Sequence, residues 1–250
     1  MSGGFVNAVL LQRDRVPSFD VHPFSVPSIR HLSELELHPS VTYIVGENGT
    51  GKSTLVEAIA VAAGFNAEGG SKNFNFTTMA SHSELAEFLT LRRCGRRERN
   101  GFFLRAESFY NVASEVKRLD DEDRASGGPS LLASYGGKSL HDQSHGESFL
   151  ALIKNRFGPN SLYLLDEPES ALSPSRQLAL LKLIHECVTK KACQFIIATH
   201  SPILMSYPES TMYLLDENGT TTTTWQETEH YQLTKAFLDH PRAFLRHLLE

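Results

Sequence analysis

One short segment constrains the fold of this chain more than any other. Residues 46–53 read Gly-Glu-Asn-Gly-Thr-Gly-Lys-Ser, which fits the pattern G-x-x-x-x-G-K-[ST] at every fixed position. The β-branched and aromatic run Val41–Val45 precedes the segment, and a stretch with helical apolar spacing, 52–63, follows it. The segment therefore predicts a strand, a glycine-rich loop and a helix whose N-terminus and backbone N–H groups surround phosphate oxygens.

The side chains of this loop predict the ligand. Lys52 is expected to reach the β- and γ-phosphates, and the Ser53 hydroxyl to bind Mg²⁺, so ATP and Mg²⁺ are the expected ligands. The alternative is a glycine-rich turn that matches by accident, and the flanking strand and helix argue against it. The residues expected to contact the nucleotide here are Asn48, Gly49, Thr50, Gly51, Lys52, Ser53 and Thr54.

Two adjacent carboxylates end a second apolar strand, 161–165. Asp166 is expected to hold Mg²⁺ through its water shell, and Glu167 to polarise an attacking water. The alternative is a pair of solvated charges that close a strand. Residues 213–217 repeat the pattern but lead into Asn218-Gly219, a strong hairpin signal, so this copy is predicted to be part of a peripheral hairpin.

Two further segments are candidate parts of the same site. His200 follows the buried strand predicted over 194–199 and could contact the γ-phosphate, because ligands bind at the carboxyl ends of strands in open α/β sheets. The alternative is a histidine that is merely hydrogen-bonded at a strand end. Residues 144–148, Ser-His-Gly-Glu-Ser, precede a predicted helix over 146–156 and could form a second anion site.

Alternation of strands and helices predicts an α/β fold. We expect a mostly parallel central sheet flanked by helices, a peripheral antiparallel part and a small helical lobe. The whole chain, 1–250, is predicted to be one domain, with the nucleotide-binding core over about 5–66 and 158–225, the helical lobe over 67–157 and C-terminal helices over 226–250. Helices are predicted over 81–91 and 111–119, a mobile loop over 120–139, and core or dimer packing for 234–249.

Composition limits the partners. The net charge of −5 gives no global field that would attract nucleic acid, so DNA would need a local patch. Arg92, Arg93, Arg96, Arg97 and Arg99 form a basic cluster that could meet phosphates or could be a solvated helix end. Three cysteines, no apolar run near the ~20 residues needed to span a bilayer and no signal-peptide pattern predict a cytoplasmic protein without membrane insertion.

The order of these motifs resembles the ATP-binding-cassette (ABC) ATPase superfamily over residues 29–202. The resemblance implies that 144–148 is the signature motif, with Ser144, Gly146 and Glu147 contacting ATP. It further implies that 170–173 is the D-loop and His200 the switch histidine. Glu107 stands where the family usually has the glutamine of the Q-loop, which contacts the metal.

Within that superfamily the chain is more similar to the RecF, SMC and Rad50 branch, and to the small stand-alone predicted AAA/ABC ATPases of bacteria, than to transporter subunits. Ser-His-Gly-Glu, 144–147, is similar to the branch's Ser-x-Gly-Glu, and Arg30 resembles a basic nucleotide-contacting residue near its first strands. Only 36 residues separate Glu107 from Ser144, without heptads, so long coiled-coil arms are not encoded there.

The resemblance implies ATP hydrolysis in a homodimer whose signature motifs cap ATP on the opposite chain. We expect an ATP-gated switch or clamp in DNA repair, maintenance or defence. Three alternatives stay open: a transporter ATPase subunit, a regulatory ATPase that times assembly with an unidentified protein partner, and a P-loop kinase. The kinase alternative leaves 144–148 and His200 unexplained.

Overall fold

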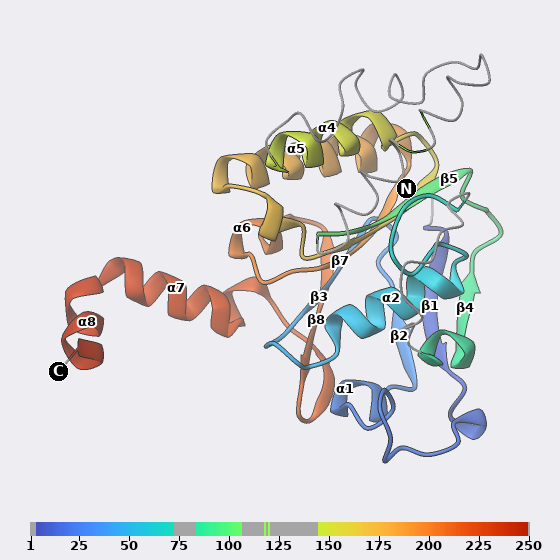
Figure 1. The fold of residues 1–250 in the computed structure, drawn as a ribbon, viewed down its shortest axis with the longest axis horizontal. Coiled ribbons are helices and arrows are strands. Elements are labelled where there is room, and N and C mark those ends of the chain that lie inside the picture. The colour runs from blue at the N-terminus through green and yellow to red at the C-terminus, as the bar shows by residue number, and fades with distance from the viewer. Residues whose placement is uncertain (1–3, 73–83, 107–117, 119, 121–144, 250) are drawn as a thin grey trace.

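The computed structural model describes residues 4–72, 84–106, 118, 120 and 145–249 (Figure 1). The predicted helix over 111–119 and the predicted loop over 120–139 lie almost wholly outside these residues. The strands are β1 (Val6–Leu11), β2 (Glu34–Glu36), β3 (Val41–Val45), β4 (Leu89–Arg93), β5 (Asn100–Arg105), β6 (Ser161–Asp166), β7 (Gln194–Ala198), β8 (Ser210–Asp216) and β9 (Gly219–Thr222). The α-helices are α1 (Pro27–Arg30), α2 (Lys52–Ala62), α4 (His145–Arg156), α5 (Pro174–Lys191), α6 (Pro202–Met205), α7 (Glu229–Asp239) and α8 (Pro241–Leu249).

A six-stranded sheet forms the centre, in the order β5-β6-β7-β3-β8-β9. All neighbouring pairs are parallel except the β8–β9 hairpin, which confirms the predicted α/β class. The prediction that the hairpin is peripheral is wrong for its first strand, because β8 pairs along its length with β3. Met212, opposite Tyr43, and Leu215, opposite Thr220, are both buried, so β8 belongs to the core and only β9 lies at the edge.

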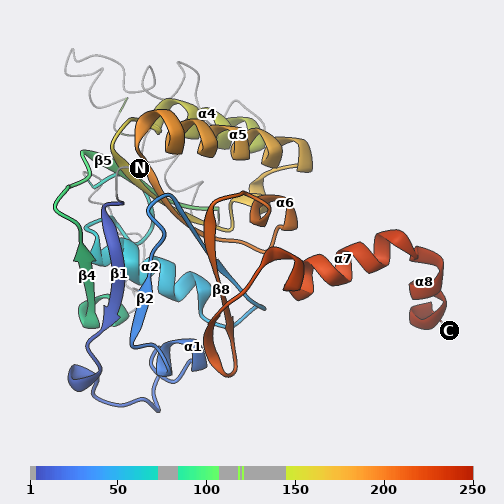
Figure 2. The same ribbon diagram turned by 180° about the vertical axis from the view of Figure 1, so that it is seen from behind.

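The central strands are buried on both faces, and their side chains divide the core by the two-residue period of a strand. In β3, Tyr43 points to the layer of α4 and α5, whereas Ile44 points to the layer of α2. Tyr163 and Leu164 of β6 divide in the same way. Figures 1 and 2 show the sheet between these two helical layers. This arrangement brings the carboxyl ends of β3, β6 and β7 to one edge, where the predicted motifs meet.

A second, antiparallel sheet in the order β2-β1-β4 covers the α2 side. The predicted helix over 81–91 is wrong beyond Phe88: a short 3-10 helix, η2 (Glu84–Phe88), passes directly into β4. Leu89 and Leu91 face the core between polar neighbours, and the strand pairs with β1, so tertiary pairing overrides the local helix signal. Residues 67–157, predicted as a helical lobe, contain the helix α4 and also two strands: β4 belongs to the antiparallel sheet and β5 to the central sheet.

The C-terminal helices leave the body of the molecule. After the 3-10 turn η6 (Trp225–Glu227), α7 and α8 extend away from the sheets (Figures 1 and 2). Core packing, one of the two roles predicted for 234–249, is therefore wrong, because α7 contains no buried residue. Five leucines of these helices are exposed instead: Leu233, Leu238, Leu245, Leu248 and Leu249. Among the described residues, no helix is long and apolar enough to cross a membrane.

Candidate nucleotide site

The loop between β3 and α2 has a backbone that only glycine adopts readily. Gly46, Gly49 and Gly51 have φ values of 145°, 82° and 93°. A Cβ on Gly46 would lie 2.2 Å from the carbonyl oxygen of Leu215, so β8 would have to move to admit any other residue. Ser28 on α1 donates a hydrogen bond to the Thr50 carbonyl at 2.5 Å, which holds the loop from the side. The residues that match the phosphate-binding pattern therefore form a close-packed turn that leads into the N-terminus of α2.

Lys52 lies inside this turn. Its side chain is almost fully buried, and its ammonium donates to the carbonyl of Glu47 at 2.9 Å. Burial lowers the pKa of Lys52, and the carboxylates of Glu167, Asp166, Glu47 and Glu169 oppose that shift. A buried ammonium at the N-terminus of a helix fits a phosphate better than any neutral ligand.

Ser53 and Asp166 face each other from the two motifs. The Ser53 hydroxyl donates to Asp166 Oδ1 at 3.0 Å, across a sequence separation of 113 residues. A hydroxyl and a carboxylate are hard oxygen ligands of the kind that Mg²⁺ takes, and Mg²⁺ usually keeps waters and substrate oxygens as its other ligands. The donor set therefore fits Mg²⁺, which Ser53 and Asp166 would hold, directly or through water, and which would neutralise phosphate charge.

Glu167 stands in a strained position directly after Asp166. Its φ of 48° lies in the left-handed region, and its N–H donates to the Ala198 carbonyl of the neighbouring strand at 3.0 Å. A non-glycine residue held there marks a special position. The turn aims the carboxylate away from the strand, so that Glu167 Oε1 lies 3.4 Å from His200 Nε2. The second copy of the motif lacks this geometry, since Asp216 caps its own hairpin turn by accepting from Asn218 N.

His200 is held from three directions at the end of β7. Its backbone N–H donates to Glu169 Oε1 at 2.5 Å, its Nε2 faces Glu167, and its Nδ1 lies 2.7 Å from Nε2 of His230. His200 is the predicted switch histidine, and the structure brings it together with Lys52 and Glu167. Burial of Glu169 raises the pKa of its carboxyl.

Two residues that the motifs did not indicate join the site. Arg105 at the end of β5 lies with its Nε 3.5 Å from Asp166 Oδ2 and donates from Nη1 to Glu57 Oε2 at 2.5 Å. His230 comes from the first turn of α7, far from any motif. A signal existed for Arg105, because it follows an apolar strand at the edge where the other site residues gather. The sequence gives no comparable signal for His230.

The start of α4 packs against the loop that follows Glu167. A Cβ on Gly146 would lie 2.8 Å from the Ala171 carbonyl oxygen and 2.4 Å from Arg176 Nη1, so the predicted signature glycine touches the predicted D-loop. Glu147 Oε1 pairs with Arg176 Nη2 at 3.4 Å. Ser144 and Glu107 lie outside the described residues, so their nucleotide and metal contacts stay predictions.

Three more residues were predicted to contact the nucleotide: Thr54, Asn48 and Arg30. Thr54 continues the first turn of α2, and Asn48 is exposed on the loop. Arg30 ends α1, on the helix that contacts Thr50, and its half-exposed side chain lies 3.6 Å from Asp20. Its contact with a nucleotide stays a prediction.

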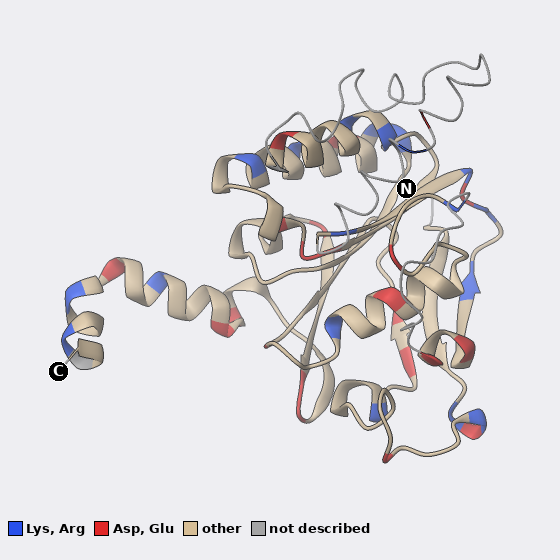
Figure 3. Ribbon diagram, in the orientation of Figure 1, with Lys and Arg blue, Asp and Glu red and all other residues tan. Residues whose placement is uncertain are grey.

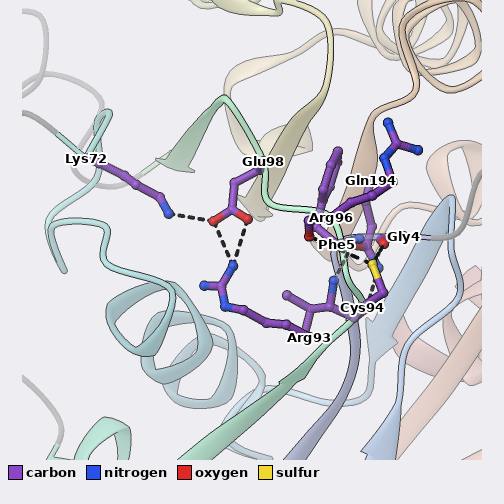
Figure 4. Close-up of polar contacts among 9 residues, drawn as sticks. Gly4, Phe5, Lys72, Arg93, Cys94, Arg96, Glu98 and Gln194 are labelled. Atoms are coloured by element: carbon purple, nitrogen blue, oxygen red, sulfur yellow. Dashed lines mark hydrogen bonds and ion pairs between the residues drawn. The ribbon is translucent and has the colours of Figure 1, made fainter.

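The five arginines of the predicted basic cluster belong to β4 and the loop before β5 (Figure 3). Two of them are paired: Arg92 with Glu34 at 2.6 Å, and Arg93 with Glu98 at 2.7 Å. Figure 4 shows Glu98 between Arg93 and Lys72. The described contacts give no carboxylate partner to the other three, of which Arg96 donates to the Asn160 side chain. The charge available for an anion is thus smaller than the sequence indicated.

The fold and the site define a class of protein. A parallel sheet with a phosphate-binding loop, a serine–aspartate pair at its end and a histidine on the adjacent strand is the arrangement of P-loop ATPase domains, which generally use ATP and Mg²⁺. Family models identify the class more closely. A model described as an AAA domain matches residues 23–125, and a second AAA-domain model, whose description also names the AbiEii toxin and a type IV toxin–antitoxin system, matches 100–206. Each match covers less than half of the chain, and together with the geometry of the site they support a P-loop ATPase domain.

Solved structures with a similar fold include three ATPase-related chains. The SMC head domain from Thermotoga maritima is 16% identical, with 88% of this chain and 98% of that chain covered and a TM-score of 0.46. The cbiO1 part of the Clostridium perfringens cbiONQ ABC transporter is 20% identical, with coverages of 87% and 91% and a TM-score of 0.46. A chain described as a metal-chelate type ABC transporter is 18% identical, with coverages of 83% and 81% and a TM-score of 0.48. No curated protein sequence matches this chain.

Proposed function

We propose that this protein binds MgATP between the loop 46–53 and Asp166 and hydrolyses it, with Glu167 as the residue that activates water. One observation carries the proposal: the Ser53 hydroxyl and the Asp166 carboxylate, from motifs far apart in the sequence, lie 3.0 Å apart beside the buried Lys52. Two oxygen ligands and a buried ammonium converge where a triphosphate would carry most charge.

The chain supplies its own matched control for this proposal. Glu167→Gln should retain ATP binding, measured with a fluorescent ATP analogue, and lose hydrolysis by about 100-fold or more, the usual effect of removing a general base. Glu217→Gln makes the same change in the second copy of the motif, where the side chain is exposed, and should hydrolyse ATP as the wild type does. Normal hydrolysis by Glu167→Gln would reject the role of Glu167, and wild-type protein that fails to bind the analogue would reject the whole proposal.

We further propose that two chains close over two ATP molecules, each chain contributing Ser144 and the start of α4 to the nucleotide of the other. Lys52 and the Mg²⁺ that Ser53 and Asp166 would hold neutralise one side of the triphosphate. Charge that develops on the other side needs additional donors. Glu167→Gln with MgATP should therefore run as a dimer in light scattering, whereas the same protein with Ser144→Arg, which adds bulk at the proposed contact, should remain monomeric. A monomer in both samples would contradict the sandwich.

The process served is proposed to be DNA maintenance or defence. The second family match supports the defence side of this proposal, because its printed description names a toxin–antitoxin system. Arg96, Arg97 and Arg99 are the cluster members left without a carboxylate in the described contacts, and they would meet DNA phosphates. A hydrolysis rate that rises with added duplex DNA, and no longer rises when these three arginines are changed to alanine, would support this role; a rate indifferent to DNA would favour a protein partner.

A further inference from the structure

The C-terminal helix α7 reaches the nucleotide site through one side chain, His230. The rings of His230 and His200 lie with their centroids 4.5 Å apart, and His200 Nδ1 is 2.7 Å from His230 Nε2. On its other side, His230 Nδ1 lies 3.6 Å from Oε1 of Glu47 in the phosphate-binding loop. The two imidazoles thus form a continuous chain from Glu167 to Glu47.

The hydrogen bond of this chain lies between the two imidazoles. The two carboxylates, 3.4 Å from His200 Nε2 and 3.6 Å from His230 Nδ1, are charged neighbours of the pair rather than hydrogen-bond partners. The short contact in the middle needs one hydrogen between its two nitrogens.

The central contact bears on the form of His200 that faces the phosphate side. When His230 Nε2 is the donor to His200 Nδ1, a neutral His200 carries its own hydrogen on Nε2. Burial lowers the pKa of His200, and the positive charges of Lys52 and His230 lower it further, against the opposing effect of Glu167 and Glu47. His200 Nε2 is buried and, among the described residues, has no hydrogen-bond partner, with Glu167 at 3.4 Å as its nearest carboxylate. A donor of this kind is oriented for an incoming phosphate oxygen.

The base of α7 contacts the body through three residues: Trp225 packs against the hydrophobic core, the Thr228 hydroxyl lies 3.8 Å from Met205 Sδ, and His230 meets His200. Thr228 is buried, accepts from Tyr231 N and donates to the Trp225 carbonyl at 2.7 Å, and the Trp225 and Tyr231 rings pack edge to face with centroids 4.6 Å apart. From there α7 and α8 extend away from the sheets (Figures 1 and 2). A displacement of the His230 ring would therefore be passed to the whole arm, 229–249.

We propose that His230 is a positioning residue that holds His200 in its donor form and thereby couples the C-terminal arm to occupation of the phosphate site. The inference rests on the proposed function, because it needs a triphosphate that His200 contacts. His230, which lies outside the motifs, thereby joins the nucleotide site, and the C-terminal arm becomes the element that responds to bound nucleotide. Binding of MgATP draws His200 Nε2 toward the phosphate, and His230, which shares the central hydrogen, follows.

A kinetic experiment tests the positioning role. His230→Ala should lower kcat for ATP about tenfold with little change in KM, the loss expected for one hydrogen bond to a charged group that acts through a transition-state contact. His230→Gln keeps a side-chain donor on α7 and should recover part of that loss. In a His200→Ala background, His230→Ala should have no further effect, because its target is gone. The matched control is His240→Ala, a histidine at the far end of the same helix.

The single tryptophan of the chain reports on the arm. Trp225 lies at the base of α7 against Tyr231, so MgATP should change its emission in the wild type and in His240→Ala, and not in His230→Ala. Binding of the fluorescent analogue, followed separately by its anisotropy, shows that each variant still takes up nucleotide.

The outcomes separate this inference from the proposed function. Wild-type protein that binds and hydrolyses ATP, with His230→Ala equal to it in kcat and in the Trp225 response, would overturn the inference and leave the function intact. Additive losses in the double variant would overturn the positioning role, since they would show that His230 acts without His200. Failure of the wild type to bind nucleotide would reject both.

Discussion

Arg105 and Asp166 stand opposite each other on the neighbouring parallel strands β5 and β6, with Arg105 Nε 3.5 Å from Asp166 Oδ2. The same guanidinium donates to Glu57 Oε2 on α2, the helix that begins at Lys52. One arginine therefore links the end of the metal-binding strand to the helix of the phosphate-binding loop. All three side chains are largely buried, so their charges interact with little screening by water.

Loss of Arg105 should be costly because it leaves two buried carboxylates without this cation. Arg105→Leu is expected to lower the free energy of unfolding by about 3 kcal/mol, the usual effect of removing one partner from a buried ion pair. Arg105→Leu combined with Glu57→Leu should be less destabilised than Arg105→Leu alone, because the double variant also removes one of the two buried carboxylates that face Arg105. Urea unfolding of the three proteins measures both values, and equal stabilities of wild type and Arg105→Leu would contradict the pairing.

The contrast between Asp166 and Arg105 shows what the sequence could predict. Asp166 and Glu167 follow a continuously apolar run and precede a helix that begins at Pro174, so motif and local structure agree. Arg105 becomes part of the site only through the register that places it opposite Asp166. Which strands are neighbours, and in what register, depends on packing of the whole sheet, and a single sequence does not encode it locally.

The wrong predictions, a helix over 81–91 and a peripheral hairpin over 213–225, also arose because strand pairing depends on the packing of the whole sheet. A local capping signal predicted a helix over 81–91, but the residues 89–93 bury two leucines by pairing with β1. A hairpin signal correctly joined β8 to β9, yet β8 lies inside the sheet because it pairs with β3 on one side and with β9 on the other. His230 could not be predicted, since no pattern around it marks contact with a strand end 30 residues earlier. Local rules thus identified the elements and the motifs, whereas tertiary packing decided their neighbours.

The buried carboxyl of Glu169 should make the free energy of unfolding depend on pH. Burial raises the pKa of its carboxyl from the ordinary 4.5, so the folded protein holds this proton at pH values where the unfolded chain has lost it. Stability that depends on the protonated carboxyl is fully present below about pH 4.5, the unfolded value, and is lost as the pH rises through the folded pKa. Glu169→Gln keeps an oxygen that can accept from His200 N and carries no proton to lose.

The stability of the Gln variant relative to the wild type should therefore increase between pH 5 and pH 8. Thermal unfolding of both proteins across this range measures the difference, with Glu217→Gln as the exposed control. A difference that stays constant or narrows as the pH rises would show that the folded pKa of Glu169 is not raised.

A substitution at Gly146 can test the contact between the start of α4 and the loop after Glu167. In Gly146→Ala the new methyl group would meet the Ala171 carbonyl at 2.8 Å, and backbone cannot rotate away as the nearby Arg176 can. Alanine favours a helix over glycine by about 1 kcal/mol, but the overlap should cost about 1–3 kcal/mol, so a net loss of stability is expected. Gly95→Ala, where nothing lies within 4 Å, is the control and should unfold as the wild type does. A more stable Gly146→Ala would mean that the two segments are not in contact.

Gln194 joins the two sheets through a side chain that uses all of its hydrogen-bonding capacity. Its Oε1 accepts from the N–H groups of Phe5 and Val6 at 2.7 and 3.0 Å, and its Nε2 donates to the carbonyls of Val6 and His38 at 2.7 and 3.0 Å. Figure 4 shows Gln194 beside Phe5. The Gln194 side chain is fully buried at the start of β7, so no water is available to replace these bonds. The strand β1, which begins at Val6, is thereby fixed to the central sheet.

Gln194→Leu has nearly the same volume and removes every one of these bonds. Up to four backbone groups would then be buried without this partner, and at about 1 kcal/mol or more for each the variant should lose about 3–5 kcal/mol of unfolding free energy. Urea unfolding measures this loss, and Gln232→Leu, on the exposed helix α7, provides the control and should change stability by less than about 0.5 kcal/mol. Hydrogen exchange locates the effect: the amides of Phe5 and Val6 should lose protection before those of β3, because Gln194 is their hydrogen-bond acceptor while β3 is held by both of its neighbours. Uniform loss of protection through both sheets would instead mean that the two sheets unfold as one unit.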